Sequence, residues 1–308
     1  GAARNSSHAR RKGSGERMKP CRSMLYIPGD SPGMIQHAPV FGADSILLDL
    51  EDAVALTEKD SARKMVACYL QDYDFKDLIV TVRVNGADTE FFDDDLKEII
   101  PCSPAAIRIP KCNGPEDVLA ADKKIEEIES ANSIPVGKVR IHAMIETAVG
   151  VENAYLIASA CPRVEAITLG GQDLTADMGV SKTKDGWELF YARSRVVVAA
   201  RAAGVNVYDT VWADISDKEG LLRECRSIVG LGFTGKAAIH PDQIETIHQA
   251  FMPDEKELKK AVRVVEAAEN AKKEGKGVIS VDGKMVDAPV VARARHLLKL
   301  ADLYGFER

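Results

Sequence analysis

The sequence has no long apolar run, no excess of basic residues and few aromatic side chains. Of its 308 residues, 45% are hydrophobic and 6% aromatic, and the formal net charge is −6. No run approaches the roughly 18 apolar residues of a membrane-spanning helix. A chain of negative net charge also lacks the basic surface that neutralises nucleic-acid phosphates. We therefore expect a soluble protein that binds neither membranes nor nucleic acid.

Cysteine pairs at metal-ligand spacing are also missing. The six cysteines are scattered, with no C-x-x-C pair among them: Cys21, Cys68, Cys102, Cys112, Cys161 and Cys225. Such spacing predicts neither a zinc site nor a disulfide framework. Reduced thiols are the simplest interpretation, so we expect a cytoplasmic location.

Several catalytic patterns are absent as well. The chain has no P-loop, no Ser-His-Asp order and no lysine that stands out inside an apolar strand. These absences argue against ATP-dependent chemistry, acyl-serine chemistry and Schiff-base aldolase chemistry.

Residues 1–17 differ from the rest of the sequence. They are rich in arginine and small polar residues and show no hydrophobic pattern. We interpret them as an expression scar or a disordered leader, with Met18 as the natural start. A transit peptide is the alternative, although the segment lacks an amphipathic period.

What the sequence does contain is a regular alternation of short apolar runs and amphipathic segments. Eight runs are expected strands, at 23–28, 45–50, 78–85, 105–111, 139–146, 166–170, 205–212 and 236–240. Helix-like segments between them include 58–71, 115–130, 188–203 and 218–230. Strict alternation predicts a parallel sheet, and eight repeats predict an α/β fold, the TIM (β/α)8 barrel, over residues 18–251. An open doubly wound sheet is the alternative, but Tyr26–Asp30 holds only one of the glycines that its phosphate turn needs.

Residues 252–308 fall outside the eightfold pattern. Residues 254–273 form a charged amphipathic helix, 278–286 a hairpin, and 288–304 a last helix. Asp282-Gly283 can take the positive φ angles of a type I′ turn. This helix–hairpin–helix is too small for a second domain, so we predict a C-terminal lid or oligomerisation segment.

Acidic residues follow the second predicted strand, at the end where barrel active sites lie. Asp49, Glu51 and Asp52 fall within four positions, and such a cluster is costly unless cations or donors compensate it. Arg83 lies near the end of the third strand and can hold a substrate carboxylate through two hydrogen bonds. The alternative is that Arg83 pairs with the three acids, and the two roles are compatible.

Two further carboxylates follow consecutive strands. Glu146 ends the fifth strand and Asp173 follows the sixth, so both lie at neighbouring strand ends. Together they form an open oxygen site suited to Mg²⁺, beside Gly170-Gly171, where the backbone can come close to a ligand. The alternatives are that Asp173 caps a turn and that Glu146 forms a salt bridge.

Three basic side chains carry weaker predictions. We expect His142 to be a core residue, because it lies below the mouth of the barrel. His240 ends the eighth strand and either lines the mouth or caps a loop. Lys111 either meets a phosphate or remains a solvated charge.

Six motifs in order resemble the citrate lyase β-chain family, the citryl-CoA lyase-like branch of the Mg²⁺-dependent HpcH/HpaI aldolase superfamily. They are Arg22-Ser-Met-Leu-Tyr-Ile-Pro-Gly, Asp49-Leu-Glu-Asp-Ala-Val, Val82-Arg-Val-Asn, Ile109-Pro-Lys, Met144-Ile-Glu-Thr and Gly170-Gly-Gln-Asp-Leu-Thr-Ala-Asp-Met-Gly. The resemblance covers about residues 20–305. Phe190-Tyr-Ala-Arg-Ser-Arg resembles the bacterial citrate lyase β chains more than their malyl-CoA and citramalyl-CoA relatives.

The resemblance implies a TIM barrel, a homotrimer and a role for each matched residue. Arg83 matches the substrate-binding arginine, Glu146 the carboxylate that binds both Mg²⁺ and substrate, and Asp173 the second Mg²⁺ ligand. The acids of the second motif, Asp49, Glu51 and Asp52, would support the waters of the metal. Asp287 matches a lid aspartate that reaches a neighbouring subunit's site, and we expect it to be catalytic. Gln172 departs from the family, in which many relatives carry glutamate.

The resemblance also implies a reaction. A Mg²⁺-dependent carbon–carbon lyase would cleave citryl-CoA, or citryl carried on an acyl carrier subunit, to oxaloacetate and an acetyl thioester. Its partners would be the α subunit and the γ (acyl carrier) subunit of citrate lyase. The alternatives are a malyl-CoA or citramalyl-CoA lyase of the same family, and a non-catalytic subunit that binds an acyl carrier.

Overall fold

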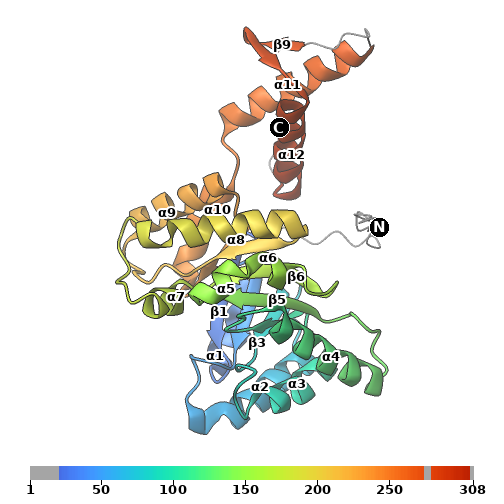
Figure 1. The fold of residues 1–308 in the computed structure, drawn as a ribbon, viewed down its shortest axis with the longest axis vertical. Coiled ribbons are helices and arrows are strands. Elements are labelled where there is room, and N and C mark those ends of the chain that lie inside the picture. The colour runs from blue at the N-terminus through green and yellow to red at the C-terminus, as the bar shows by residue number, and fades with distance from the viewer. Residues whose placement is uncertain (1–20, 274–278, 306–308) are drawn as a thin grey trace, which may run out of the picture.

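The predicted strands form a closed parallel barrel in sequence order (Figure 1). The computed structural model describes residues 21–273 and 279–305. The barrel strands are β1 Ser23–Pro28, β2 Ser45–Asp49, β3 Ile79–Arg83, β4 Ala106–Ile109, β5 Arg140–Ile145, β6 Val164–Leu169, β7 Asn206–Asp209 and β8 Gly235–Ala238. The prediction of a TIM barrel is confirmed and the open-sheet alternative is wrong. The predicted leader 1–17, the start at Met18 and the first hairpin residue, Val278, lie outside the described residues.

Helices follow the strands and cover the outside of the barrel. They are α1 Pro32–His37, α2 Lys59–Asp72, α3 Phe92–Ile99, α4 Pro115–Ala131, α5 Ala148–Glu152, α6 Ala154–Ala158, α7 Gly171–Asp177, α8 Phe190–Ala203, α9 Lys218–Leu231 and α10 Ile244–Phe251. The outward strand residues, such as Leu25, Ile46 and Ile107, are fully buried in the main hydrophobic core with helix residues such as Val66 and Ile125. Inward and outward side chains alternate along each strand. The other face of the strands is therefore left to line the barrel interior.

A small second core forms at the C-terminus. Helix α11 (Glu255–Lys273) packs against α12 (Ala288–Leu303) through Leu258, Ala261, Val264, Ala294, Leu298 and Ala301, and Val286 of the hairpin joins this core. Strands β9 (Ile279–Val281) and β10 (Lys284–Val286) form the predicted hairpin, and Asp282 and Gly283 have φ angles of 50° and 73°. Figure 1 shows this helix–hairpin–helix segment projecting from the barrel. Of the helices in the described residues, none is long and apolar enough to span a membrane.

The C-terminal segment returns to the barrel at the last residues of α12. The Arg22 guanidinium, just before β1, lies 4.4 Å from the ring centre of Tyr304. This contact is at the end of the barrel where the strands begin. Helix α12 is 16 residues long, so its first turn lies about 24 Å from that contact.

A lysine inside β8 contradicts one expectation from the sequence. Lys236 is fully buried, and its Nζ lies 2.8 Å from Asp209 and 2.7 Å from Glu224 of α9. Arg193 of α8 donates two hydrogen bonds of 2.9 Å to the same Asp209. The expectation that no lysine stands out inside an apolar strand overlooked Lys236, which begins the predicted strand 236–240 and turns its side chain toward the helices. Its ammonium is paired with two acids, so the structure offers no free amine for Schiff-base chemistry at this position.

Candidate active site

The carboxyl ends of the barrel strands surround a pocket of about 530 Å³. Its lining includes four predicted site residues, Asp49, Asp52, Arg83 and Asp173, and two further residues of the barrel interior, Tyr26 and Arg108. These residues come from four strands, from the turn after β2 and from the first turn of α7. The closed topology therefore brings together side chains that are up to about 150 positions apart in the sequence.

Arg83 is held by the acids that follow β2. Its Nε and Nη2 donate to the two carboxylate oxygens of Asp49 at 2.7 and 2.6 Å. Its Nη1 lies 2.9 Å from Glu51 and 3.3 Å from the more exposed Asp52. Burial alone would lower the pKa of Arg83, but its hydrogen bonds with Asp49 and that residue's charge raise it well above the usual value. The structure thus shows the alternative in which Arg83 pairs with the acids.

Glu146 has one carboxylate oxygen without a partner. The side chain is 1% exposed, its Oε1 accepts the backbone N–H of Lys111 at 2.7 Å, and its Oε2 is buried with no hydrogen bond from the described residues. Burial, followed by the charges of Glu51 and Asp173, raises the pKa of Glu146 to about 8. A buried carboxylate oxygen without a donor is costly, so this site calls for a cation.

Asp173 supplies the second carboxylate of the site. It lies in the first turn of α7, lines the pocket, and makes no hydrogen bond or ion pair within the described part of the chain. Thr175 instead donates to the backbone carbonyls of Gly171 and Gln172, so Asp173 does not cap that turn. A Cβ atom at Gly170 would lie only 2.5 Å from Glu146 Oε2, which shows how closely the backbone approaches the free oxygen.

The donor set fits a magnesium ion. No group of three or more His, Cys, Asp or Glu side chains converges as a metal site in the residues that the structure describes. Mg²⁺ is often bound by one or two protein carboxylates, because it keeps several waters or substrate oxygens as its other ligands. Glu146 and Asp173 supply two carboxylates, and Glu146 has a free oxygen. The residues present therefore fit this metal better than one that demands a full protein cage.

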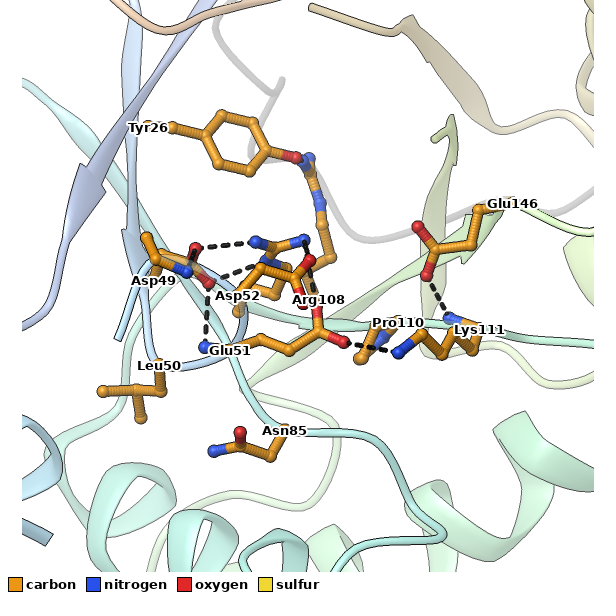
Figure 2. Close-up of polar contacts among 12 residues, drawn as sticks. Tyr26, Asp49, Leu50, Glu51, Asp52, Asn85, Arg108, Pro110, Lys111 and Glu146 are labelled. Atoms are coloured by element: carbon orange, nitrogen blue, oxygen red, sulfur yellow. Dashed lines mark hydrogen bonds and ion pairs between the residues drawn. The ribbon is translucent and has the colours of Figure 1, made fainter. Parts of the chain in front are cut away.

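Glu51 and Lys111 connect the two halves of the site. Figure 2 shows Glu51 between Asp49 and Lys111, with Glu146 on the far side of Lys111. The Lys111 Nζ lies 3.4 Å from Glu51 and is half exposed. Burial, then the charges of Asp52 and Asp49, raise the pKa of Glu51 to about 7, although Arg83 opposes this shift. Lys111 thus contacts both glutamates, Glu51 through its ammonium group and Glu146 through its backbone N–H.

The remaining sequence candidates lie apart from this pocket. His142 is buried, with Nε2 3.5 Å from Glu165, in agreement with the prediction of a core histidine. His240 accepts the backbone N–H of Asp242 and so caps a loop. Asp287 accepts the backbone N–H of Val290 at 3.1 Å and caps the start of α12. Within one chain, Asp287 is therefore in the projecting C-terminal segment and not in the pocket.

Two residues of the pocket were missed by the sequence analysis. Arg108 lies on the inner face of β4 and donates a hydrogen bond to the hydroxyl of Tyr26 on β1, as Figure 2 shows. The only sequence signal for Arg108 is a single arginine within the apolar run 105–109. Tyr26 lies within the motif that begins at Arg22, but the sequence pattern predicts no role for its hydroxyl.

Comparisons with known proteins agree with this geometry. The model of the family described as HpcH/HpaI aldolase/citrate lyase matches residues 22–241. The citrate lyase subunit beta of Leuconostoc mesenteroides is 44% identical, over 91% of this chain and 93% of that protein. The subunit of the same name from Escherichia coli K12 is 42% identical, over 92% of this chain and 94% of that protein.

A solved structure extends the likeness to three dimensions. The CitE protein of Mycobacterium tuberculosis in complex with magnesium, acetoacetate and coenzyme A superposes with a TM-score of 0.76 at 29% identity. The match covers 92% of this chain and all of that one. Family model, sequence relatives and structure all span the barrel and its pocket, and the chain therefore belongs to the HpcH/HpaI aldolase/citrate lyase family.

Proposed function

We propose that this chain is a carbon–carbon lyase that cleaves a citryl thioester to oxaloacetate and an acetyl thioester, as citrate lyase β subunits do. The observation that carries the proposal is the free, buried oxygen of Glu146 beside Asp173 at the mouth of the barrel. It lies in a chain that is 44% identical to a citrate lyase β subunit. The substrate would be citryl-CoA or citryl carried on an acyl carrier subunit.

Glu146 and Asp173 would hold the Mg²⁺ ion, while Asp49, Glu51 and Asp52 would support its waters. Bound there, the metal would act as a Lewis acid toward the hydroxyl and the carboxylate of the citryl group. CitE of Mycobacterium tuberculosis was crystallised with magnesium, and the two carboxylates of this chain fit the same ion.

The reaction is a retro-Claisen cleavage in which the chain's own side chains handle charge and protons. The tertiary hydroxyl gives its proton to solvent, and the O–H electron pair forms the keto group of oxaloacetate. The C–C bond breaks at the same time, and its electron pair forms the enolate of the acetyl thioester. Arg83 would hold a substrate carboxylate through Nη1, whose contact with the exposed Asp52 at 3.3 Å is its longest. Fixed donors of this kind stabilise charge where it develops. Asp287 of a neighbouring lid would then deliver a proton to the enolate carbon.

The proposal includes an assembly and a location. We propose a homotrimer in which residues 252–308 form the lid and oligomerisation segment and residues 18–251 the catalytic barrel. We further propose that it works with citrate lyase α and γ (acyl carrier) subunits in the cytoplasm. In support, all six cysteines are free thiols.

The decisive experiment is product detection. Citryl-CoA and Mg²⁺ should yield oxaloacetate, which malate dehydrogenase and NADH can report continuously. A malyl-CoA or citramalyl-CoA lyase would instead release glyoxylate or pyruvate from its own substrate. A non-catalytic carrier-binding subunit would release none of the three.

Asp173→Asn should lower Mg²⁺ affinity at least tenfold without unfolding the barrel. The substitution is nearly isosteric but removes the charge that Mg²⁺ requires. Isothermal titration with Mg²⁺ measures the change directly. Asp177→Asn is a matched control in the same helix. Among the described residues, Asp177 accepts the backbone N–H of Ala148, which an amide oxygen can also do. Equal Mg²⁺ affinity for both variants and the wild type would contradict the metal assignment.

Arg83→Lys should lower kcat/KM by roughly two orders of magnitude or more, which corresponds to about 2.7 kcal/mol. Lysine keeps the positive charge but lacks the planar guanidinium group. That group lets Arg83 bind both oxygens of Asp49 and reach the pocket at the same time. Steady-state kinetics with citryl-CoA measure the effect. Wild-type kinetics for the lysine variant would show that Arg83 only holds the acids in place.

A further inference from the structure

The pocket contains a second arginine, Arg108, that has no acidic partner. Arg108 is 1% exposed and lines the pocket. Of the five N–H donors of a guanidinium, one reaches the Tyr26 hydroxyl and one reaches the sulfur of Met24. Its Nε is buried without a partner. Within the described residues, no carboxylate lies within ion-pair distance of Arg108.

Arg83 provides a direct comparison at the same level of the barrel. The two arginines are opposite one another in the register of β3 and β4, and each guanidinium lies 5.5 Å from the ring centre of Tyr26. Arg83 has Asp49, Glu51 and Asp52 around it. In the described part of the chain, Arg108 has a hydroxyl and a thioether as its only hydrogen-bond partners. One of the two neighbouring charges is therefore compensated by the protein and the other is not.

The surroundings of Arg108 suit a small anion. Thr168 also lines the pocket, and its buried Oγ1 has no hydrogen-bond partner among the described residues. Met144 and Ala237 supply apolar walls. Burying an unpaired charge is strongly unfavourable, so a carboxylate that enters the pocket would gain a guanidinium already stripped of water. Arginine binds carboxylates through two parallel N–H bonds.

We propose that Arg108 is a specificity-determining residue that binds the carboxymethyl carboxylate of the citryl group. This inference rests on the proposed function. A citramalyl thioester has a methyl group where the citryl thioester has a carboxymethyl group, and the corresponding keto acids are pyruvate and oxaloacetate. An uncompensated guanidinium in the pocket favours the substrate with the extra charge. It also leaves a costly unpaired group when the methyl analogue binds.

The test replaces Arg108 by methionine and compares the two substrates. Arg108→Met should lower kcat/KM for citryl-CoA at least a hundredfold relative to kcat/KM for citramalyl-CoA. Arg108→Lys keeps the charge but not the planar guanidinium group. Its ratio of kcat/KM for citryl-CoA to kcat/KM for citramalyl-CoA should lie between those of Arg108→Met and the wild type. The thermal midpoint of Arg108→Met should be unchanged or higher, because the variant removes a buried charge that has no counter-ion. A merely structural arginine would instead lower the midpoint and affect both substrates equally.

Arg163→Met is the matched control. Arg163 is also a buried arginine, but it pairs with Asp122 and Glu129 and does not line the pocket. Its replacement should lower the thermal midpoint and leave the substrate ratio unchanged. An Arg108→Met variant with an unaltered ratio, or with equal losses on both substrates, overturns the proposal for Arg108.

A binding measurement separates this inference from the proposed function. Oxaloacetate and pyruvate are titrated in the presence of Mg²⁺ against wild type and Arg108→Met, with no turnover required. If the wild type binds oxaloacetate more tightly than pyruvate and Arg108→Met does not, the role of Arg108 is supported. This holds even if the wild type cleaves no citryl-CoA and the proposed function fails. Cleavage of citryl-CoA by the wild type, with the same dicarboxylate preference in both proteins, leaves the function intact and overturns the inference.

Discussion

Lys236→Met is expected to lower the free energy of unfolding by about 3–5 kcal/mol, the range typical when one partner of a buried ion pair is removed. The lysine is fully buried, and its Nζ contacts Asp209, Glu224 and the Thr210 carbonyl at 2.7–2.8 Å. Methionine has a similar length but leaves two buried carboxylates with Arg193 as their shared cation. Chemical denaturation measures the loss, and the exposed Lys97→Met should change stability by no more than about 0.5 kcal/mol.

The same variant has a predicted pH signature. Lys236 and Arg193 outweigh burial and lower the pKa of Asp209 from 3.8 to about 2. A carboxyl group with a depressed folded-state pKa stabilises the protein above its unfolded pKa, and this stabilisation is lost as the pH falls toward 2. The difference in the free energy of unfolding between wild type and Lys236→Met should therefore become smaller as the pH falls from about 4 to 2. If this difference in the free energy of unfolding is small at neutral pH, or stays constant down to pH 2, Lys236 is not the counter-ion of Asp209.

Much of the fold could be predicted because alternation and length are local signals. The predicted helix 218–230 and strand 23–28 match α9 and β1 within one residue. The predicted strands tended to run too far at their carboxyl ends. Residues 84 and 85 illustrate the reason: Val84 is still bonded to the Arg108 carbonyl, whereas the Asn85 N–H turns to the Asp95 carboxylate. Extended backbone thus continues past the last ladder residue without changing the hydrophobic pattern.

The site was only partly predictable, because the sequence shows which residues are acidic but not which ones meet. Position after a strand placed the carboxylates of Glu146 and Asp173 at the mouth of the barrel. Arg108 and Lys236 were missed for a shared physical reason. In a barrel both faces of a strand are buried, so a single charged residue does not reveal whether it points into the pocket or toward the helices. Register and tertiary packing decide that question, and the sequence contains no local signal for either.

Asp287→Asn should lower turnover by about two to four orders of magnitude if this residue transfers the proton to the enolate. Asparagine is the informative replacement because Asp287 also caps α12, accepting the Val290 N–H at 3.1 Å. Alanine would remove the cap, at a cost of about 1 kcal/mol, and so would confuse catalysis with stability. The asparagine variant should keep the wild-type thermal midpoint and Mg²⁺ affinity, with the loss confined to steady-state kcat.

Mixing two inactive variants then decides whether Asp287 acts within its own chain. Asp287 begins a helix whose second half faces its own barrel near the end where the strands begin. We therefore propose that Asp287 reaches the pocket of a neighbouring subunit. Asp173→Asn chains contribute an intact Asp287, and Asp287→Asn chains contribute an intact metal site. In a symmetric ring formed from equal amounts, about a quarter of the sites combine both, which sets the expected activity relative to wild type. Subunit exchange can be followed by mass-resolved labelling of one variant. If the chains exchange and the mixture is no more active than its separate components, Asp287 does not complete a neighbour's site, and it acts within its own chain or not at all.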